Sequence, residues 1–159
     1  MPFPAAVERV ADHLREAAAE SRIQEFPDGT PTAEAAARAI GCEPAQIVKS
    51  LVFDCGGRFA VALVPGDRRA DPKRVATAAG VERARVATPE QVVEITGFEP
   101  GAVAPFPLPR VETVLLDRTL LAQELVWVGA GSDRHMAALT PPELARVARA
   151  RPADLVLRS

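Results

Sequence analysis

The residue best suited to chemistry in this chain is Lys49, which lies in the apolar run from Gln46 to Phe53. Lysine is scarce, since the chain has one other, Lys73, against seventeen arginines. An ammonium group inside a strand-like apolar segment is costly to bury unless an acidic neighbour or an anionic ligand compensates its charge. Lys49 therefore either binds negative charge or lies on the solvated face of a half-buried strand.

A second candidate is the segment 126–132, which reads Val-Trp-Val-Gly-Ala-Gly-Ser. We expect an apolar strand that runs into a turn formed by Gly129, Gly131 and Ser132. Such a turn can present backbone N–H groups to an oxygen anion. On its own the pattern is equally typical of an ordinary hairpin, but together with Lys49 it indicates a site that binds negative charge.

A serine or cysteine hydrolase needs a histidine beside its nucleophile, and the chain has two, His13 and His135. His13 falls at the edge of the polar face of the first predicted helix, where we expect a solvated side chain. His135 follows the glycine-rich segment and is either a site residue or an ordinary strand-surface residue. Cys42 and Cys55 lie beside a helix end and in a predicted hairpin turn, positions typical of structural cysteines.

Composition places the chain among soluble globular proteins. It has 159 residues, which predicts one domain over residues 1–159, with 48% hydrophobic and 25% charged residues. The net charge of −2 argues against a protein coated in positive charge, although a local basic patch remains compatible with it. We see no membrane span and no secretory signal. A reduced, cytoplasmic protein fits best, and the oligomeric state stays open.

No metal or cofactor is expected from the motifs. The His, Cys, Asp and Glu residues show no metal-ligand spacing. The glycines of 129–132 form neither a phosphate-binding loop of the Walker type nor a dinucleotide fingerprint.

Helical spacing of apolar residues, capping residues and glycine stops predict five helices. They cover residues 5–21, 32–40, 71–79, 88–97 and 140–150. Alternating or continuous apolar runs predict strands at residues 23–26, 47–54, 59–64, 111–117, 124–128, 134–139 and 155–157. Helices and strands intermix without a regular βαβ repeat, which favours an α+β fold with a mixed, partly barrel-like sheet surrounded by helices.

Five sequence blocks occur in order along the chain. They are residues 32–36 (Thr-Ala-Glu-Ala-Ala), 46–53 (Gln-Ile-Val-Lys-Ser-Leu-Val-Phe), 62–69 (Ala-Leu-Val-Pro-Gly-Asp-Arg-Arg), 96–101 (Thr-Gly-Phe-Glu-Pro-Gly) and 126–132. Together they resemble the YbaK/EbsC family over about residues 20–150. This family comprises free-standing aminoacyl-tRNA deacylases similar to the editing domain of bacterial prolyl-tRNA synthetases.

The resemblance implies metal-independent hydrolysis of the ester that joins a wrong amino acid to tRNA. It places Lys49 near the scissile ester and the terminal phosphate. Gly129, Gly131 and Ser132 would hold the aminoacyl group and the reacting carbonyl, and Gly101 would border the amino-acid pocket. It further implies substrate contacts from Thr32, Ser50, Phe26 and His135.

Two departures from the family pattern leave the amino acid undetermined. Relatives that act on cysteinyl-tRNA carry two adjacent glycines and a serine in the central loop, whereas this chain has Gly-Ala-Val-Ala-Pro at 101–105. Lys49 is followed by Ser50 where other branches have threonine or asparagine. The reaction class fits physically, because an ester is a reactive substrate that positioning and oxyanion stabilisation can hydrolyse without a covalent nucleophile.

The basic cluster of Arg68, Arg69, Lys73 and Arg74 is interspersed with two aspartates. It would either contact tRNA phosphates or form an ordinary solvated surface. The expected partners are a mischarged tRNA, most simply tRNA(Pro) carrying a small amino acid, and, as a second candidate, prolyl-tRNA synthetase. Two alternatives stay open: a non-catalytic module that binds tRNA or a synthetase, and hydrolysis of another small acyl ester.

Overall fold

The computed structural model describes residues 3–157. Its helices are α1 (Ala5–Glu16), α2 (Ala33–Ile40), α3 (Pro72–Ala79), α4 (Pro89–Thr96) and α5 (Pro141–Ala148), with 3-10 turns η1 (Pro44–Gln46) and η2 (Arg118–Ala122). Its strands are β1 (Ile23–Glu25), β2 (Ile47–Asp54), β3 (Phe59–Pro65), β4 (Arg85–Val86), β5 (Thr113–Asp117), β6 (Val126–Ser132), β7 (His135–Leu139) and β8 (Arg151–Ala153).

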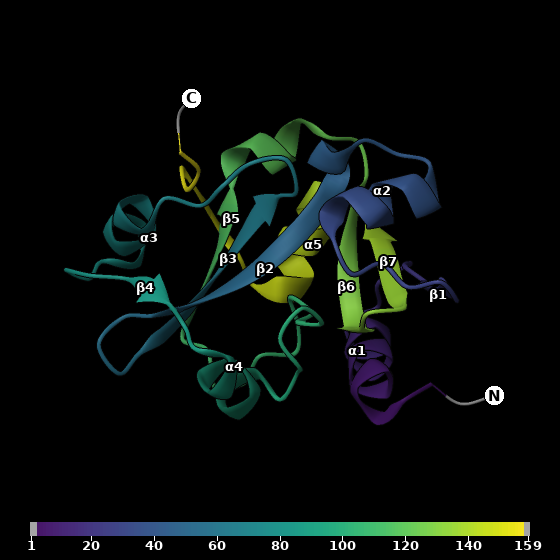
Figure 1. Ribbon diagram of the computed structural model, residues 1–159, viewed down its shortest axis with the longest axis horizontal. Coiled ribbons are helices and arrows are strands. Elements are labelled where there is room, and N and C mark those ends of the chain that lie inside the picture. Colours follow the sequence, from purple (N-terminus) through teal and green to yellow (C-terminus); the bar gives the residue numbers. More distant parts are fainter. Residues whose placement is uncertain (1–2, 158–159) are drawn as a thin grey trace.

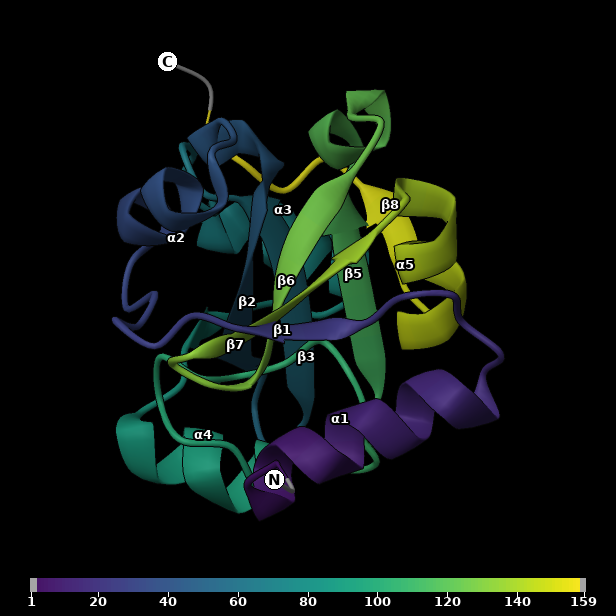
Figure 2. The same ribbon diagram turned by 90° about the vertical axis from the view of Figure 1, so that its right-hand side faces the viewer.

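The strands form one mixed sheet in the order β1-β7-β6-β2-β3-β5-β8, and β4 pairs with β2 outside this path (Figure 1). β2–β3 and β6–β7 are antiparallel hairpins, whereas β2–β6, β3–β5 and β5–β8 are parallel pairs. The sheet twists so strongly that its outer strands run in very different directions (Figure 2). The predicted α+β class with a mixed sheet is confirmed.

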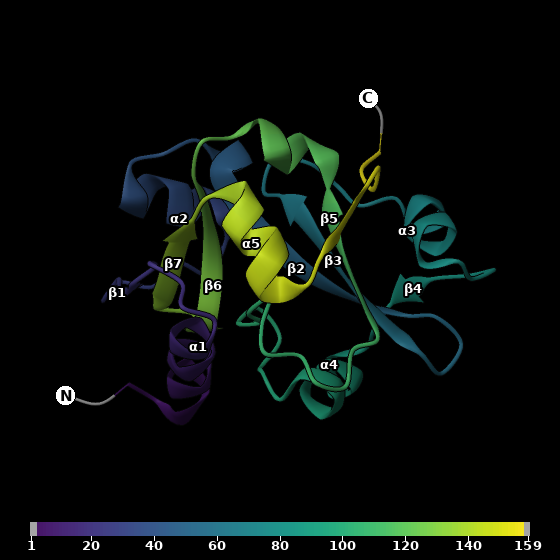
Figure 3. The ribbon, with the colours of Figure 1, turned by 180° about the vertical axis from the view of Figure 1, so that it is seen from behind.

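Helices cover the sheet on more than one side. α5 lies across the back of the sheet in Figure 3, and α1 packs beside β6. The largest core cluster joins these two helices to β2, β5 and β6 and includes two phenylalanines of the loop after α4, Phe98 and Phe106. Smaller clusters lie under α3 and under α2. The molecule therefore presents α2 and α3 on the face opposite α5, along β2 (Figure 1).

The predicted helix starts are confirmed by local hydrogen bonds. Thr32, Thr88 and Thr140 each accept, through the side-chain oxygen, the N–H of the residue three positions on. Asp71 accepts the N–H of Lys73. α2, α3 and α4 end at glycines in the left-handed region. These short helices are thus defined by their own capping residues.

Several boundaries differ from the sequence prediction. α1 ends at Glu16 instead of continuing to residue 21, because the chain turns at Ala18, whose φ is +54°. Segment 155–157 contributes one bridge, between Ala70 and Val156, instead of a strand. β4, β8 and the 3-10 turns carry no strong local pattern and were not predicted. Within residues 3–157, no helix is long and apolar enough to cross a membrane.

His13 is not a solvated side chain, as the sequence suggested. Its ring stacks on Phe106 with centroids 5.3 Å apart, and its Nε2 lies 3.1 Å from the carbonyl oxygen of Val147. The ring thus fastens α1 to the loop after α4 and to α5, because a half-buried imidazole combines an apolar face with a hydrogen-bonding edge. It lies away from the cavity described below.

Candidate active site

The candidate site lies where two parallel strands separate. β2 pairs with β6 at two positions, Ile47 with Trp127 and Val48 with Val128. Beyond them β2 runs diagonally away from β6 (Figure 1), and on this edge it next pairs at Phe53, with β4. The gap opens into a cavity of about 510 Å³, a volume typical of small-molecule sites.

The cavity collects residues from six parts of the chain, namely segment 30–36, β2, Gly66, the loop after α4, β6 and β7. Six of the sequence-predicted site residues line it: Thr32, Lys49, Ser50, Gly101, Gly129 and Ser132. They come from the start of α2, the middle of β2, the loop after α4 and the end of β6. Apolar atoms of Ala36, Val103 and Met136 complete the wall. The site is therefore an apolar pocket with a few polar groups.

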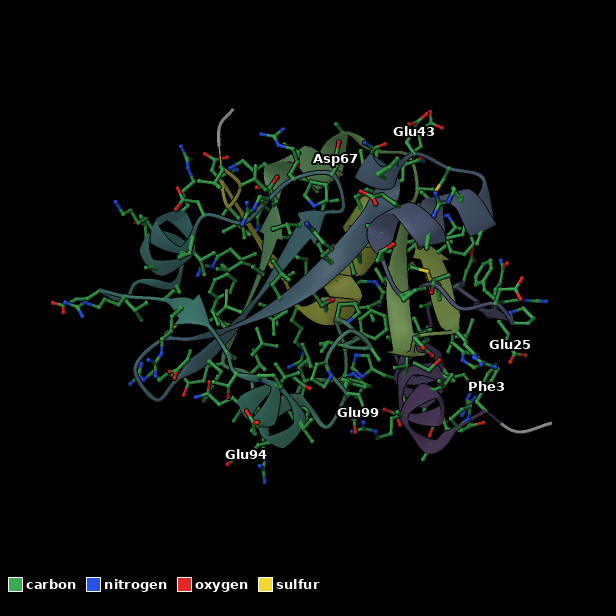
Figure 4. The ribbon with its side chains drawn as sticks, in the orientation of Figure 1. Phe3, Glu25, Glu43, Asp67, Glu94 and Glu99 are labelled. Carbon is green, nitrogen blue, oxygen red and sulfur yellow. The ribbon has the colours of Figure 1, made fainter. Side chains whose placement is uncertain are left out.

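Lys49 is half-buried, and its Nζ donates a hydrogen bond to the carbonyl oxygen of Arg68 at 2.6 Å. Burial lowers the pKa of its ammonium below the ordinary value, the Asp67 carboxylate opposes this, and Arg69 reinforces it. Figure 4 places Asp67 in the loop after β3, at the upper end of the sheet. An ammonium has three donors, so two remain for a substrate oxygen or water.

Ser50 turns its backbone into the gap. On one side of β2, the carbonyl oxygen of Ile47 accepts the N–H of Gly66 at 2.7 Å; on the other, that of Val52 accepts the N–H of Ala87 at 2.9 Å. Because backbone groups alternate along a strand, the N–H and C=O of Ser50 share the side of Val52. The ladders with β6 and β4 both miss Ser50, and its buried hydroxyl has no hydrogen-bond partner among the described residues. β2 thus offers the cavity one donor and one acceptor from its main chain.

The glycine-rich segment is a bulged strand, not the turn that the sequence predicted. β6 continues to Ser132, and the hairpin turn is Asp133-Arg134. Gly129 pairs with Met136 and Ser132 with His135, so Ala130 and Gly131 have no counterpart on β7. A bulge needs an unusual backbone conformation, which Gly131 supplies with a φ of +102°. The bulge aims Ser132 at the cavity.

Gly131 itself faces helix α1 instead of the main cavity. A Cβ on Gly131 would lie 2.9 Å from the backbone carbon and oxygen of Ala6 and 3.1 Å from the nitrogen of Val7. On its other side Gly131 borders a neighbouring cavity of about 480 Å³, shared with Gly101 and Ser132. Position 131 therefore requires a glycine because the backbone of helix α1 packs closely against it, and not because a substrate does.

Ser132 and His135 form a hydrogen-bonded pair. Ser132 Oγ lies 2.6 Å from His135 Nδ1 and accepts the N–H of Arg134 at 3.0 Å. His135 is 5% exposed and does not line the cavity. In the tautomer with its proton on Nε2, it accepts the Ser132 hydroxyl hydrogen, which leaves one serine lone pair for the cavity. His135 is thus a buried residue that contacts Ser132 from behind. The alternative that the sequence allowed, an ordinary strand-surface position, is wrong.

An aromatic contact holds His135 from behind. The Phe3 ring meets the imidazole edge-on, with centroids 5.4 Å apart and an interplanar angle of 79°. Phe3 precedes α1, at the lower right of Figure 4. The segment before α1 therefore packs against the start of β7, and the backbone of α1 packs against the end of β6.

Other predicted site residues lie outside the cavity. Phe26 packs edge-on against Trp127, with centroids 6.3 Å apart, under α2. In the basic cluster, Arg68 donates to the carbonyl oxygen of Leu157 at 3.1 Å and Arg74 pairs with Asp71 at 3.7 Å. Lys73 lines a separate cavity. The residues of the basic cluster therefore have different local contacts and do not line one common surface of the candidate site.

Two of the cavity residues that the sequence reasoning did not propose as site residues have a clear chemical or steric role. Glu34, on the first turn of α2, is the one carboxylate among the described lining residues. Gly66 has no room for a Cβ, which would lie 2.6 Å from the Ala33 Cβ and 2.8 Å from the carbonyl oxygen of Pro44. The dipeptide Pro65-Gly66, at the end of a predicted strand, was the available signal.

The described residues contain no group of three or more His, Cys, Asp or Glu side chains that could hold a metal ion. The cavity instead offers an ammonium group, a serine hydroxyl and main-chain groups of an unpaired strand segment. Such a set can bind and polarise a carbonyl or phosphate oxygen.

Comparison with known proteins decides the family. Residues 27–147, about three quarters of the chain, match the family model of the aminoacyl-tRNA editing domain. The chain belongs to this family. The family resemblance predicted from the five sequence blocks is confirmed.

Relatives in the editing-domain family include free-standing proteins. The uncharacterised Bacillus subtilis protein YwhH is 35% identical over 136 residues, which are 85% of this chain and 86% of YwhH. A crystal structure assigned as a trans-editing enzyme for prolyl tRNA synthetase superposes with a TM-score of 0.91 at 35% identity, covering 99% of this chain and 100% of that one. The whole fold, including α1, is therefore shared with a free-standing protein.

The family also includes a domain of larger synthetases. The proline–tRNA ligase of Bacillus licheniformis is 33% identical over 105 residues, which are 65% of this chain but 18% of the ligase. The chain thus spans about a fifth of the length of the ligases it matches. The matched segment is therefore a small part of each ligase.

Proposed function

We propose that this chain acts in trans as an aminoacyl-tRNA deacylase, hydrolysing the ester between a wrong amino acid and its tRNA. The observation that carries the proposal is the cavity between β2 and β6, where Lys49 and Ser132 line a space bordered by unpaired main chain. The similarity to domains of proline–tRNA ligases supports tRNA(Pro) bearing a small amino acid as the substrate.

The chemistry needs one bond made and one broken. Water attacks the carbonyl carbon of the ester, negative charge develops on the carbonyl oxygen, and the ribose oxygen leaves with the proton that water supplied. Lys49 is placed to stabilise the developing charge, since its ammonium retains two free donors. We expect the Ser50 N–H and the free lone pair of Ser132 to orient the aminoacyl group.

The cavity wall favours a small substrate side chain. Ala36, Val103 and Met136 provide apolar contact, and the volume of about 510 Å³ must hold the terminal ribose as well as the amino acid. Gly129 borders the cavity, where a Cβ would make an ordinary van der Waals contact with the carbonyl oxygen of Val103 at 3.4 Å and would take up part of the space. Glu34 supplies the one negative charge of the wall and is suited to the α-ammonium of an aminoacyl group.

Phe26 and Gly131 are assigned structural parts in this proposal, the first under α2 and the second against α1. Arg68, Arg69, Lys73 and Arg74 are proposed to contact tRNA phosphates. Their local hydrogen bonds do not prevent this, because a guanidinium has five donors. The reaction is proposed to need no metal and to take place in the cytoplasm, where charged tRNA is found.

A panel of mischarged tRNAs tests the function. Each tRNA is mixed with excess protein, and release of its amino acid is followed in a single turnover, with uncharged tRNA as competitor. We expect release of one or a few small amino acids from tRNA(Pro) and inhibition by uncharged tRNA. Binding of tRNA without release of any amino acid would establish a binding module. Turnover of simple acyl esters that uncharged tRNA does not inhibit would establish a different esterase.

A further inference from the structure

A second cavity, of about 620 Å³, lies at the other end of β2. It is bounded by the β2–β3 hairpin at Gly56-Gly57, the first turns of α3 and the segment 82–85. Figure 1 shows these parts together at one side of the molecule, where α3 and β4 flank the far end of the diagonal strand β2. The ester chemistry described above uses none of them, although Lys73 also belongs to the basic cluster proposed above to contact tRNA.

Three cations line this cavity: Lys73, Arg83 and Arg85. Of these, Arg85 pairs with Asp54 at 3.3 Å, and its side chain remains 79% exposed. Among the ion pairs of residues 3–157, none involves Lys73 or Arg83. The cavity therefore has cationic groups whose charge the fold does not use.

The Asp54 carboxylate is held in the wall and offsets the charge of Arg85, which leaves Lys73 and Arg83 as the cations of the lining without an ion pair among the described residues. Its two oxygens accept from Gly56 N, Gly57 N, Gln91 Nε2 and Arg85. With four donors directed at it, Asp54 orders the hairpin and directs the Arg85 guanidinium, which keeps several N–H groups for another acceptor. The remaining carboxylate, Glu82, is exposed.

One strand, β2, borders both cavities. Lys49 borders the first cavity and Asp54 the second. Both lie on β2, five residues apart, which corresponds to roughly 17 Å along an extended strand. A polyanion whose end occupies the first cavity can reach the second within a few phosphates.

We propose that the second cavity binds backbone phosphates of the same tRNA, a few nucleotides before the aminoacylated ribose. The inference rests on the proposed function, because the position of the tRNA end sets the distance. Phosphate contacts fix register without reading sequence, so this cavity would let the protein hold a tRNA end while the amino acid is tested in the first cavity.

The test compares two substrates and two variants. One variant is Arg83→Glu, which should fold, because Arg83 is exposed and forms no ion pair within residues 3–157. The matched control is Arg22→Glu, an exposed arginine in the segment between α1 and β1. These two elements lie at the other side of Figure 1 from α3 and β4. The substrates are full-length aminoacyl-tRNA and a short aminoacyl oligonucleotide that ends at the terminal trinucleotide.

We expect Arg83→Glu to raise KM for aminoacyl-tRNA about tenfold at moderate salt, with kcat unchanged. The salt dependence of log kcat/KM should flatten by about 0.7 to 0.9 for each contact removed. Turnover of the short substrate should not change, and Arg22→Glu should behave as wild type with both substrates. Thermal unfolding checks that each variant is folded.

An equal loss on both substrates, or no loss on the full tRNA, would overturn the phosphate site. If Arg83→Glu instead abolishes competition by free inorganic phosphate or a mononucleotide and leaves tRNA turnover intact, the phosphate site on tRNA is rejected and the cavity serves a small phosphate ligand. A wild type that turns over neither substrate would reject the proposed function itself, an outcome distinct from the other two.

Discussion

The ammonium of Lys49 donates to the main-chain carbonyl of Arg68 across 2.6 Å, so the loop after β3 holds the lysine in place. The sequence required an acidic partner or an anionic ligand for a lysine in this strand. A carbonyl dipole satisfies one donor but does not neutralise the charge, and Asp67 favours the ammonium through space. The positive charge is therefore positioned by the fold and available to a substrate.

The first prediction is that Lys49→Ala lowers single-turnover deacylation roughly 10²- to 10³-fold, the scale for loss of one oxyanion donor. Lys49→Arg should not restore the rate, because a planar guanidinium cannot take the place of a compact ammonium. Arg38→Ala, which removes an exposed cation from α2, is the matched control and should keep the wild-type rate. Affinity for uncharged tRNA should fall only modestly, since one contact among several is lost.

Lys49→Ala should also leave stability unchanged or raise it. Burial lowers the pKa of the ammonium, so the unfolded chain binds this proton more tightly than the folded one. Stability of the wild type then rises relative to Lys49→Ala as the pH rises towards the ordinary lysine pKa of 10.5. Urea unfolding of both proteins at neutral and alkaline pH measures this. A wild-type rate in folded Lys49→Ala would reduce Lys49 to a strand-surface residue.

The second prediction concerns Gly131 and revises the expectation from sequence. The family resemblance implies that Gly131 holds the aminoacyl group, so that Gly131→Val would mainly impair deacylation. Because a Cβ there meets the Ala6 backbone at 2.9 Å, we now expect a loss of stability on the order of 3 kcal/mol from overpacking and backbone strain. Gly57→Ala is the control, since Gly57 shares a positive φ of +95° but has open space around it. Equal unfolding midpoints for the two variants would refute the role of α1.

The third prediction is that Phe3 positions His135. Phe3→Leu should remove the edge-on contact and lower kcat by allowing the His135–Ser132 pair to reorient, whereas Phe3→Tyr should retain most activity. A double-mutant cycle with His135→Ala isolates the effect, since contacting residues couple by about 0.5–3 kcal/mol. If Phe3→Leu changes kcat and the unfolding midpoint by the same amounts in the wild type and in His135→Ala, the two residues are not coupled and Phe3 does not position His135.

The fourth prediction uses the pKa of Asp54. It is lowered to about 2, first by the Gln91 amide, then by the Gly57 N–H, with further help from Arg85 and Gly56. A carboxylate with a depressed pKa contributes stability above its ordinary pKa of 3.8, and this is lost as the pH falls through about 2. Asp54→Asn should therefore be less stable than wild type at neutral pH, and the difference should shrink between pH 3.8 and 2. A difference independent of pH would show that the charge is unimportant.

The fifth prediction is that prolonged chelation leaves deacylation unchanged, because the described residues offer no cluster of metal ligands. The measurement is the single-turnover rate after dialysis against a chelator, with and without added zinc. Loss of activity that zinc restores would contradict the proposed reaction.

Features set by neighbouring residues were predictable from the sequence. The starts of α2, α3, α4 and α5 follow from capping side chains that bond within two or three residues, and such contacts form in any fold. The hairpin β2–β3 follows from two apolar runs around Gly56-Gly57. Lys49 stood out because an ammonium in an apolar run has a cost that does not depend on fold.

Only the tertiary structure decided how the site is assembled. Helix α1, more than a hundred residues earlier in the chain, packs against the bulge and leaves no room for a Cβ at Gly131. β8 is a strand because β5 offers it a parallel edge, and the cavity exists because β6 and β4 both leave Ser50 unpaired. Contacts between distant segments leave no local pattern, since their energy comes from burial and pairing with partners that the chain folds to meet.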